Sequence, residues 1–131
     1  MFLFKFEPKN LVRFPFVGTG KFMVPEIIAK TNMEIKEAEK IDIYSFGVTL
    51  YCLFYGRNPY NLHEVHGRDY EKILQQIQKE KLEFPKERKI SNLFKDFLEK
   101  TLEKDYKKRI GINEALNHPW IKASKAIINF I

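Results

Sequence analysis

Residues 40–54 carry apolar side chains on nearly every face of the helix that they predict. Gly56 stands just past this stretch, where glycine is favoured as a left-handed cap. A helix at the surface of a globular protein would keep a polar stripe toward water, and this one has none. We therefore expect a central helix that the rest of the protein surrounds.

The rest of the chain predicts shorter helices separated by breakers. Residues 70–79 place apolar side chains on one face and charges on the other, and Ser91 is a plausible N-cap for the next helix. Gly111 opens a last helix, which Pro119 stops. Residues 1–17 show no helical period and should be extended or irregular. The expected fold is all-α, with strands left open only near the N-terminus.

Composition indicates one globular domain. The chain has 131 residues, of which 44% are hydrophobic and 31% are charged. Its formal charge of +6 would suit a nucleic-acid partner. However, lysines and arginines alternate with acidic residues along much of the chain, and only residues 107–109 form a compact basic cluster. Solvated helix surfaces explain this pattern better, so we expect no nucleic-acid partner.

Cysteine usage and hydropathy favour a cytoplasmic protein. Cys52 is the single cysteine, so no internal disulfide can form, which suits a reducing compartment. The three histidines are widely and irregularly spaced, which gives no zinc pattern. Lys5 and Glu7 make the N-terminal segment a poor signal peptide, and the apolar segment of residues 41–55 is too short to cross a bilayer. We expect neither a metal nor a membrane partner.

Three short signatures, in fixed order, resemble the back half of a eukaryotic protein kinase domain. They are Gly18-Thr19-Gly20-Lys21-Phe22-Met23-Val24-Pro25-Glu26, Asp42-Ile43-Tyr44-Ser45-Phe46-Gly47, and Lys108-Arg109-Ile110 followed by His118-Pro119-Trp120. Each signature is weak alone, but three in this order and at the family's spacing are specific. Residues 56–60 and 114–121 resemble serine/threonine kinases near the calcium/calmodulin-dependent group.

The resemblance implies the helical C-terminal lobe of the protein kinase fold, without the N-terminal β lobe and the catalytic loop. It divides the chain into an irregular N-terminal segment (residues 1–17), a partial kinase domain that forms the substrate-binding lobe (18–122) and a short tail (123–131). Whether the missing front half reflects biology or an incomplete gene model is not decided by the sequence.

The resemblance also implies structural roles for several residues. Glu26 and Arg109 match a partly buried ion pair that ties the activation segment to the final helices, and a guanidinium fork meeting a carboxylate is geometrically specific. Asp42 matches an aspartate that accepts N–H bonds from the catalytic loop. Here it is either prepared for a segment that this chain lacks, or satisfied by helix-end N–H groups or water. Gly47 and Trp120 are expected to be structural, the tryptophan as a buried anchor for the last helix.

Four residues of the first signature match the family's substrate-binding positions. Thr19 resembles the threonine that favours serine or threonine as the phosphate acceptor, and Gly20 gives the backbone freedom to turn beside it. Phe22 and Met23 resemble the pocket for the residue that follows the acceptor, although Phe22 is equally explained by core packing. Gly20, Phe22 and Val24 depart from the family's usual proline, tyrosine and alanine, which predicts an altered or relaxed pocket.

The residues that perform phosphoryl transfer have only look-alikes in this chain. Transfer from ATP needs a glycine loop over the phosphates, a lysine, metal-binding groups and a catalytic aspartate. Residues 18–21 fail the glycine-loop patterns, residues 66–69 follow the central helix instead of preceding it, and residues 96–98 lie in mid-helix. We expect no catalytic, cofactor-binding or metal-binding residue here, whereas a complete family domain uses ATP and Mg.

Three functions remain open. The favoured one is a serine/threonine kinase fragment, inactive alone, whose family transfers the γ-phosphate of ATP to protein serine or threonine and whose partner is a protein substrate. The second is a non-catalytic protein-interaction module, because the central helix without its usual cover would expose an apolar surface for a docking partner. The third, a basic helical nucleic-acid binder, requires a steep salt dependence of binding.

Overall fold

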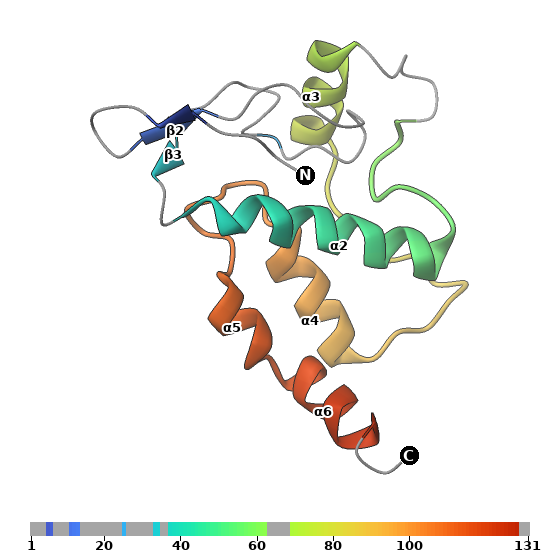
Figure 1. Cartoon of the computed structure of the whole chain (residues 1–131). Helices are drawn as coiled ribbons and strands as arrows, with labels where there is room; N and C mark the ends of the chain where they lie inside the picture. The colour runs from blue at the N-terminus through green and yellow to red at the C-terminus, as the bar shows by residue number, and fades with distance from the viewer. Residues whose placement is uncertain are drawn as a thin grey trace.

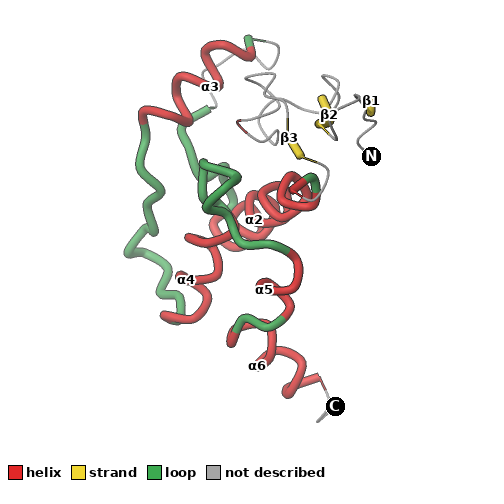
Figure 2. Tube along the Cα trace, turned by 90° about the vertical axis from the view of Figure 1, so that its left-hand side faces the viewer, coloured by secondary structure: helices red, strands yellow, loops and turns green. Residues whose placement is uncertain are grey.

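The computed structural model describes residues 5–6, 11–13, 25, 33–34, 37–62 and 69–128. The described helices are α2 (Glu39–Tyr55), α3 (Tyr70–Lys79), α4 (Asn92–Thr101), α5 (Ile112–Leu116) and α6 (Pro119–Ile128). Helix α2 crosses the middle of the lobe, with α3 on one side and α4, α5 and α6 on the other (Figure 1 and Figure 2). The predicted helical fold is confirmed.

Three short strands near the N-terminus accompany the helices. They are β1 (Lys5–Phe6), β2 (Leu11–Arg13) and β3 (Met33–Glu34). The strands form an antiparallel sheet in the order β1-β2-β3, with Phe6 opposite Val12 and Val12 opposite Met33. The first two lie in the segment for which the sequence left strands open.

Local sequence signals set the helix ends. Gly56 follows α2 with a φ of 73°, and its N–H bonds to the Cys52 carbonyl at 2.8 Å, so the predicted left-handed cap is confirmed. The Ser91 hydroxyl accepts the Phe94 N–H at 3.1 Å and begins α4 as predicted. Pro119, however, does not only stop α5. It also occupies the first turn of α6, where a missing N–H is harmless.

Two apolar clusters hold the helices together. The larger joins α2, α3 and α4 through side chains that are almost fully buried, among them Tyr44, Ile73 and Leu98. The smaller joins α2, α4 and α5 through Ile43, Phe97, Ile110 and Ala115. Because both clusters contain α2 and α4, the packing of these two helices is the centre of the described lobe.

Gly47 lets α2 and α4 approach closely. A Cβ atom at this position would lie 2.6 Å from the Thr101 hydroxyl oxygen and 3.1 Å from the Leu102 side chain. Thr101 is fully buried and its hydroxyl donates to the Leu98 carbonyl at 3.2 Å, so it has little room to move. The absence of a side chain at Gly47 therefore permits the close contact between the two helices.

One face of α2 is exposed, contrary to the expectation that protein surrounds this helix. Asp42, Phe46, Thr49 and Leu53 follow one another at helical spacing, and all four are exposed, Phe46 by 45% and Leu53 by 77%. We call these four residues the α2 stripe. The sequence prediction was wrong here because an apolar pattern shows what a helix can bury, not whether another element covers it.

His118 links α4 to the start of α6. Its Nδ1 accepts the Trp120 N–H at 3.1 Å, which leaves the proton on Nε2, and Nε2 donates to the Asp96 carboxylate at 2.6 Å. Lys100 pairs with the same carboxylate oxygen at 3.0 Å. The bond from His118, and then that from Lys100, hold the pKa of the Asp96 carboxyl below its usual value.

We predict that Gly47→Ala destabilises the protein. Overpacking costs about 1–3 kcal/mol, whereas replacing a helix glycine by alanine returns at most about 1 kcal/mol. The free energy of unfolding in urea should fall by about 1–2 kcal/mol in total. Thr49→Ala, at an exposed position of the same helix, is the control and should change it by less than about 0.5 kcal/mol. A Gly47→Ala protein as stable as the control would contradict the close approach.

Asp96→Asn should weaken the protein in a pH-dependent way. A lowered carboxyl pKa stabilises the fold fully above the usual value of 3.8, and this contribution is lost as the pH falls through the lowered pKa. Because the Asp96 side chain is 45% exposed, the loss at pH 7 should stay below about 1 kcal/mol. Urea titrations should show the two proteins converging below about pH 4. Glu99→Gln, also on α4, is the control, and a pH-independent Asp96→Asn difference would refute the link.

Candidate functional site

The side chain of Arg109 is buried, with 1% of the residue exposed. It belongs to the loop between α4 and α5. Within this loop the Asp105 carbonyl accepts the N–H groups of Lys108 and Arg109, each at 3.0 Å, and the Asp105 carboxylate accepts the Lys107 N–H at 3.0 Å. This turn reverses the chain, so that Arg109 lies inside the lobe while its two lysine neighbours are exposed.

Backbone carbonyls surround the buried charge. Arg109 donates from Nε to the Glu103 carbonyl at 2.7 Å and from Nη2 to the Lys104 carbonyl at 3.2 Å. Its Nη1 reaches the Lys40 carbonyl, in the first turn of α2, at 2.9 Å. The Tyr44 ring lies 4.8 Å from the guanidinium carbon. The planar guanidinium thus joins the α4–α5 loop to the start of α2. A lysine ammonium could not, because it is a compact charge and does not hold several donors in one fixed plane.

A second link joins the same turn of α2 to α5. The Glu39 carboxylate accepts the N–H of Ile112, the first residue of α5, at 3.2 Å. This contact was not predicted from the sequence. Its only signal was an acidic residue in the first turn of the central helix, and nothing in the sequence indicated which N–H group that carboxylate would reach.

The other predicted site residues divide into two groups. Thr19, Gly20, Phe22, Met23 and Glu26 lie outside the residues that the structure describes, so their substrate-binding roles and the pairing of Glu26 with the guanidinium stay predictions.

Asp42 and Trp120 lie within the described part. Asp42 is exposed on the α2 stripe, so water can reach its carboxylate, which agrees with the second of the two alternatives that the sequence left open. Trp120 is only half-buried, although it was expected to be buried. Its ring lies against Phe94 and Phe97, with centroids 4.7 and 5.0 Å away.

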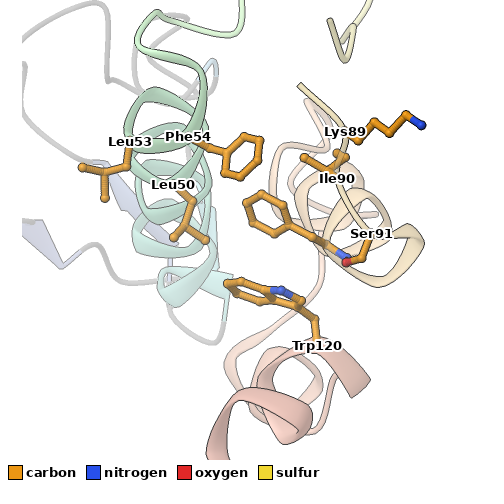
Figure 3. Close-up of a pocket in the computed structure, with 8 residues that line it drawn as sticks. Leu50, Leu53, Phe54, Lys89, Ile90, Ser91 and Trp120 are labelled. Carbon is orange, nitrogen blue, oxygen red and sulfur yellow. The ribbon is translucent and has the colours of Figure 1, made fainter. Parts of the chain in front are cut away.

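An apolar groove opens beside Trp120, between α2 and α4. Its cavity volume is about 430 Å³. We call it the α2–α4 groove; its lining residues are Leu50, Leu53, Phe54, Lys89, Ile90, Ser91, Phe94 and Trp120. In Figure 3, Leu50, Phe54 and Trp120 surround the space, while Leu53 points away from it toward the outer side of α2. The sequence predicts an exposed apolar surface on the central helix but not this groove, because the walls of the groove come from three separate helices and a loop.

The described residues do not fit a magnesium–nucleotide site. Asp69, in the look-alike of the catalytic loop, caps α3 by accepting the Lys72 N–H at 3.3 Å. Asp96, in the look-alike of the metal-binding triplet, bonds His118 and Lys100. Within the described ranges no three metal-ligating side chains gather, and no described helix could span a membrane. Asp69 and Asp96 therefore make structural contacts in the described part of the chain.

Comparison with known proteins agrees with this architecture. The family model of the protein kinase domain matches residues 6–121. The chain belongs to the protein kinase family. The resemblance carried by the three signatures is thereby confirmed, and the helices of Figure 1 form a helical lobe of the kinase fold.

Individual kinases are similar over most of this chain. Myosin light chain kinase A of Dictyostelium discoideum is 33% identical over 126 residues, which cover 95% of the chain and 40% of that kinase. Serine/threonine-protein kinase ssp1 of Schizosaccharomyces pombe is 36% identical over 108 residues, which cover 79% of the chain and 16% of that kinase. The chain thus spans less than half the length of either relative.

We predict that Arg109→Met disrupts the contact between the α4–α5 loop and α2 and destabilises the protein. The substitution keeps much of the side-chain length but leaves three carbonyls without their donor, which should lower the free energy of unfolding by about 3 kcal/mol or more. Urea denaturation followed by circular dichroism measures the change. Lys108→Met, at the exposed neighbouring position, is the matched control and should stay within about 0.5 kcal/mol of the wild type. Equal stability of both variants would show that the carbonyl bonds contribute nothing.

Proposed function

We propose that this chain is the substrate-binding lobe of a serine/threonine protein kinase, a family that transfers the γ-phosphate of ATP to protein serine or threonine, and that it is inactive on its own. The observation that carries the proposal is the buried Arg109 at the junction of α2 and the α4–α5 loop, the position at which the kinase signatures predict an anchor. The names of the two similar kinases support the serine/threonine type, and the motifs suggest the calcium/calmodulin-dependent group.

Inactivity of the isolated chain follows from the chemistry of the transfer. The reaction depends on positioning ATP, magnesium and an acceptor hydroxyl with dedicated groups. The aspartates that could imitate two of those groups are engaged elsewhere, Asp69 in capping α3 and Asp96 in binding His118. We therefore propose that this chain binds neither ATP nor Mg by itself and that a complete family domain supplies both sites.

Substrate recognition is proposed for the first signature. Thr19 and Gly20 would lie beside the acceptor hydroxyl, and Phe22 with Met23 would receive the residue that follows it. The partner in this role is a protein substrate, with no part for nucleic acid or membrane. A cytoplasmic location is consistent with the single free cysteine, Cys52.

A non-catalytic protein-interaction module derived from a kinase is the second candidate. The exposed apolar residues of the α2 stripe and the adjoining α2–α4 groove favour it, because apolar surfaces of this kind often mark interaction sites. In this alternative the lobe would bind a protein through that surface without handling a phosphate group.

The proposal is tested by incubating the purified full chain with magnesium, γ-labelled ATP and a generic basic protein substrate. No label should be transferred, and calorimetric titration with Mg–ATP should show no binding, because the groups required for both are missing. A mock purification that lacks the chain sets the background. Label above that background would refute the inactive-lobe proposal, and so would saturable nucleotide binding.

A further inference from the structure

We propose that α3 opens and closes as a separate unit of the lobe and that three residues at its C-terminal end hold it closed. These residues are Asn61, Glu80 and Lys104, and we call them the α3 latch. This conformational property goes beyond the proposed function, which concerns the binding of a substrate.

Helix α3 is attached to the lobe through one face. It lies on the opposite side of α2 from α4, α5 and α6 (Figure 1 and Figure 2). Ile73 and Ile77 are its two buried residues, and both belong to the larger apolar cluster. The smaller cluster, in the part of the chain that the structure describes, contains no residue of α3. Helix α3 can therefore move away without separating α2 from α4, whose contact runs through both clusters.

The opposite face of α3 is polar and meets the solvent. Its exposed residues are Glu71, Lys72, Gln75, Gln78 and Lys79. This face gains nothing from the closed position, so the closed position of α3 depends on its buried face and on the bonds at its ends.

Glu80 connects the C-terminal end of α3 to two loops. It is the C-cap of the helix, and its N–H bonds to the Gln76 carbonyl at 3.0 Å. Its carboxylate accepts the N–H of Asn61, in the loop after α2, at 2.7 Å. Its carbonyl accepts a hydrogen bond from the ammonium of Lys104, in the loop after α4. One residue thus ties the end of α3 to segments that lie 19 and 24 positions away in the chain.

The ammonium of Lys104 lies above a buried ring. Its Nζ is 5.1 Å from the centroid of the Tyr60 ring, and this tyrosine is 3% exposed. Burial lowers the pKa of the Lys104 amine, although the carboxylates of Glu80 and Glu103 oppose this shift. The loss of hydration therefore offsets part of what the ring contact and the bond to Glu80 contribute, and the latch holds α3 only weakly.

Water can reach the bonds of the α3 latch. Asn61 is exposed, and Glu80 and Lys104 are half-buried. When the latch opens, water replaces each lost partner, so no polar group is left buried without a hydrogen bond. The main cost of opening is the exposure of Ile73 and Ile77 together with the cluster side chains against which they pack. Segments with few buried contacts and accessible hydrogen bonds are those that open locally while the rest of a protein stays folded.

The segment after the latch is anchored separately, which locates the hinge. Residues 81–91 form neither helix nor strand. Within them, the Glu83 carbonyl accepts the Tyr51 hydroxyl of α2 at 2.7 Å, and the Phe84 ring lies 6.4 Å from the Tyr51 ring. An opening of α3 that breaks the bonds of Glu80 but keeps those of residues 83 and 84 must bend the chain at residues 81–82.

Hydrogen exchange of the full chain, followed by mass spectrometry at low urea concentrations, tests the proposal. The amides of residues 70–80 should exchange before those of α2 and α4, because only α3 loses its bonds in the open state. Lys104→Met keeps an apolar stem beside Tyr60 but removes the donor. It should speed the exchange of the α3 amides about three- to tenfold and leave the α4 amides unchanged.

Two matched pairs of variants separate the latch from general effects. Lys107→Met, at an exposed lysine of the same loop as Lys104, should leave the exchange of α3 unchanged. Glu80→Ala removes the carboxylate that binds Asn61 and should also speed the exchange of α3, whereas Glu83→Ala, at an exposed side chain, should not. Circular dichroism melts show that each variant is folded, and the Glu80 and Glu83 pair decides the question if Lys104→Met does not fold.

Two results would overturn the proposal. One is exchange of the α3 amides no earlier than that of α2 and α4 in the wild type, which would make the described lobe a single cooperative unit. The other is a latch variant that behaves like its control or that speeds α3 and α4 equally, which would mean global destabilisation. Neither result depends on label transfer, so the failure of this proposal is distinguishable from failure of the proposed function.

Discussion

The close packing of α4 across the glycine of α2 is the contact on which the described lobe depends. Because Gly47 has no side chain, Thr101 and Leu102 reach the backbone of the central helix. Both apolar clusters run through this crossing, and α3, α5 and α6 gain their burial from helices that it has already positioned. The α2–α4 pair is thus the centre of the lobe. A substitution at this contact should also destabilise the packing of the other helices.

Hydrogen bonds also connect the α4–α5 loop and the start of α5 to the first turn of α2. Arg109 satisfies the Lys40 carbonyl there and two carbonyls of its own loop, while Glu39 in the same turn receives the N–H of Ile112. A buried guanidinium keeps its charge and therefore needs several acceptors, which fixes the loop in one geometry. The bonds from Arg109 and Glu39 thus hold the α4–α5 loop and the start of α5 against the first turn of α2.

The same arrangement leaves the opposite face of α2 open. Phe46 and Leu53 are exposed on this face, although Phe46 still meets Phe97 of α4, and the neighbouring Phe54 meets Phe94 of the same helix. Substrate recognition is proposed for the segment before α2, whereas the alternative interaction surface lies on the C-terminal half of α2 beside α4 and α6.

The family, the bounds of α3 and the caps at Gly56 and Ser91 could be predicted from the sequence, because motif order, helical periodicity and capping are properties of neighbouring residues. The exposure of Asp42 and the bond from Arg109 to the Lys40 carbonyl, in contrast, are visible only in the folded chain. Exposure and long-range hydrogen bonds depend on which distant elements come to lie beside a residue. That information is absent from any local window, since the walls of the α2–α4 groove are separated by up to 70 positions in the chain, from Leu50 to Trp120.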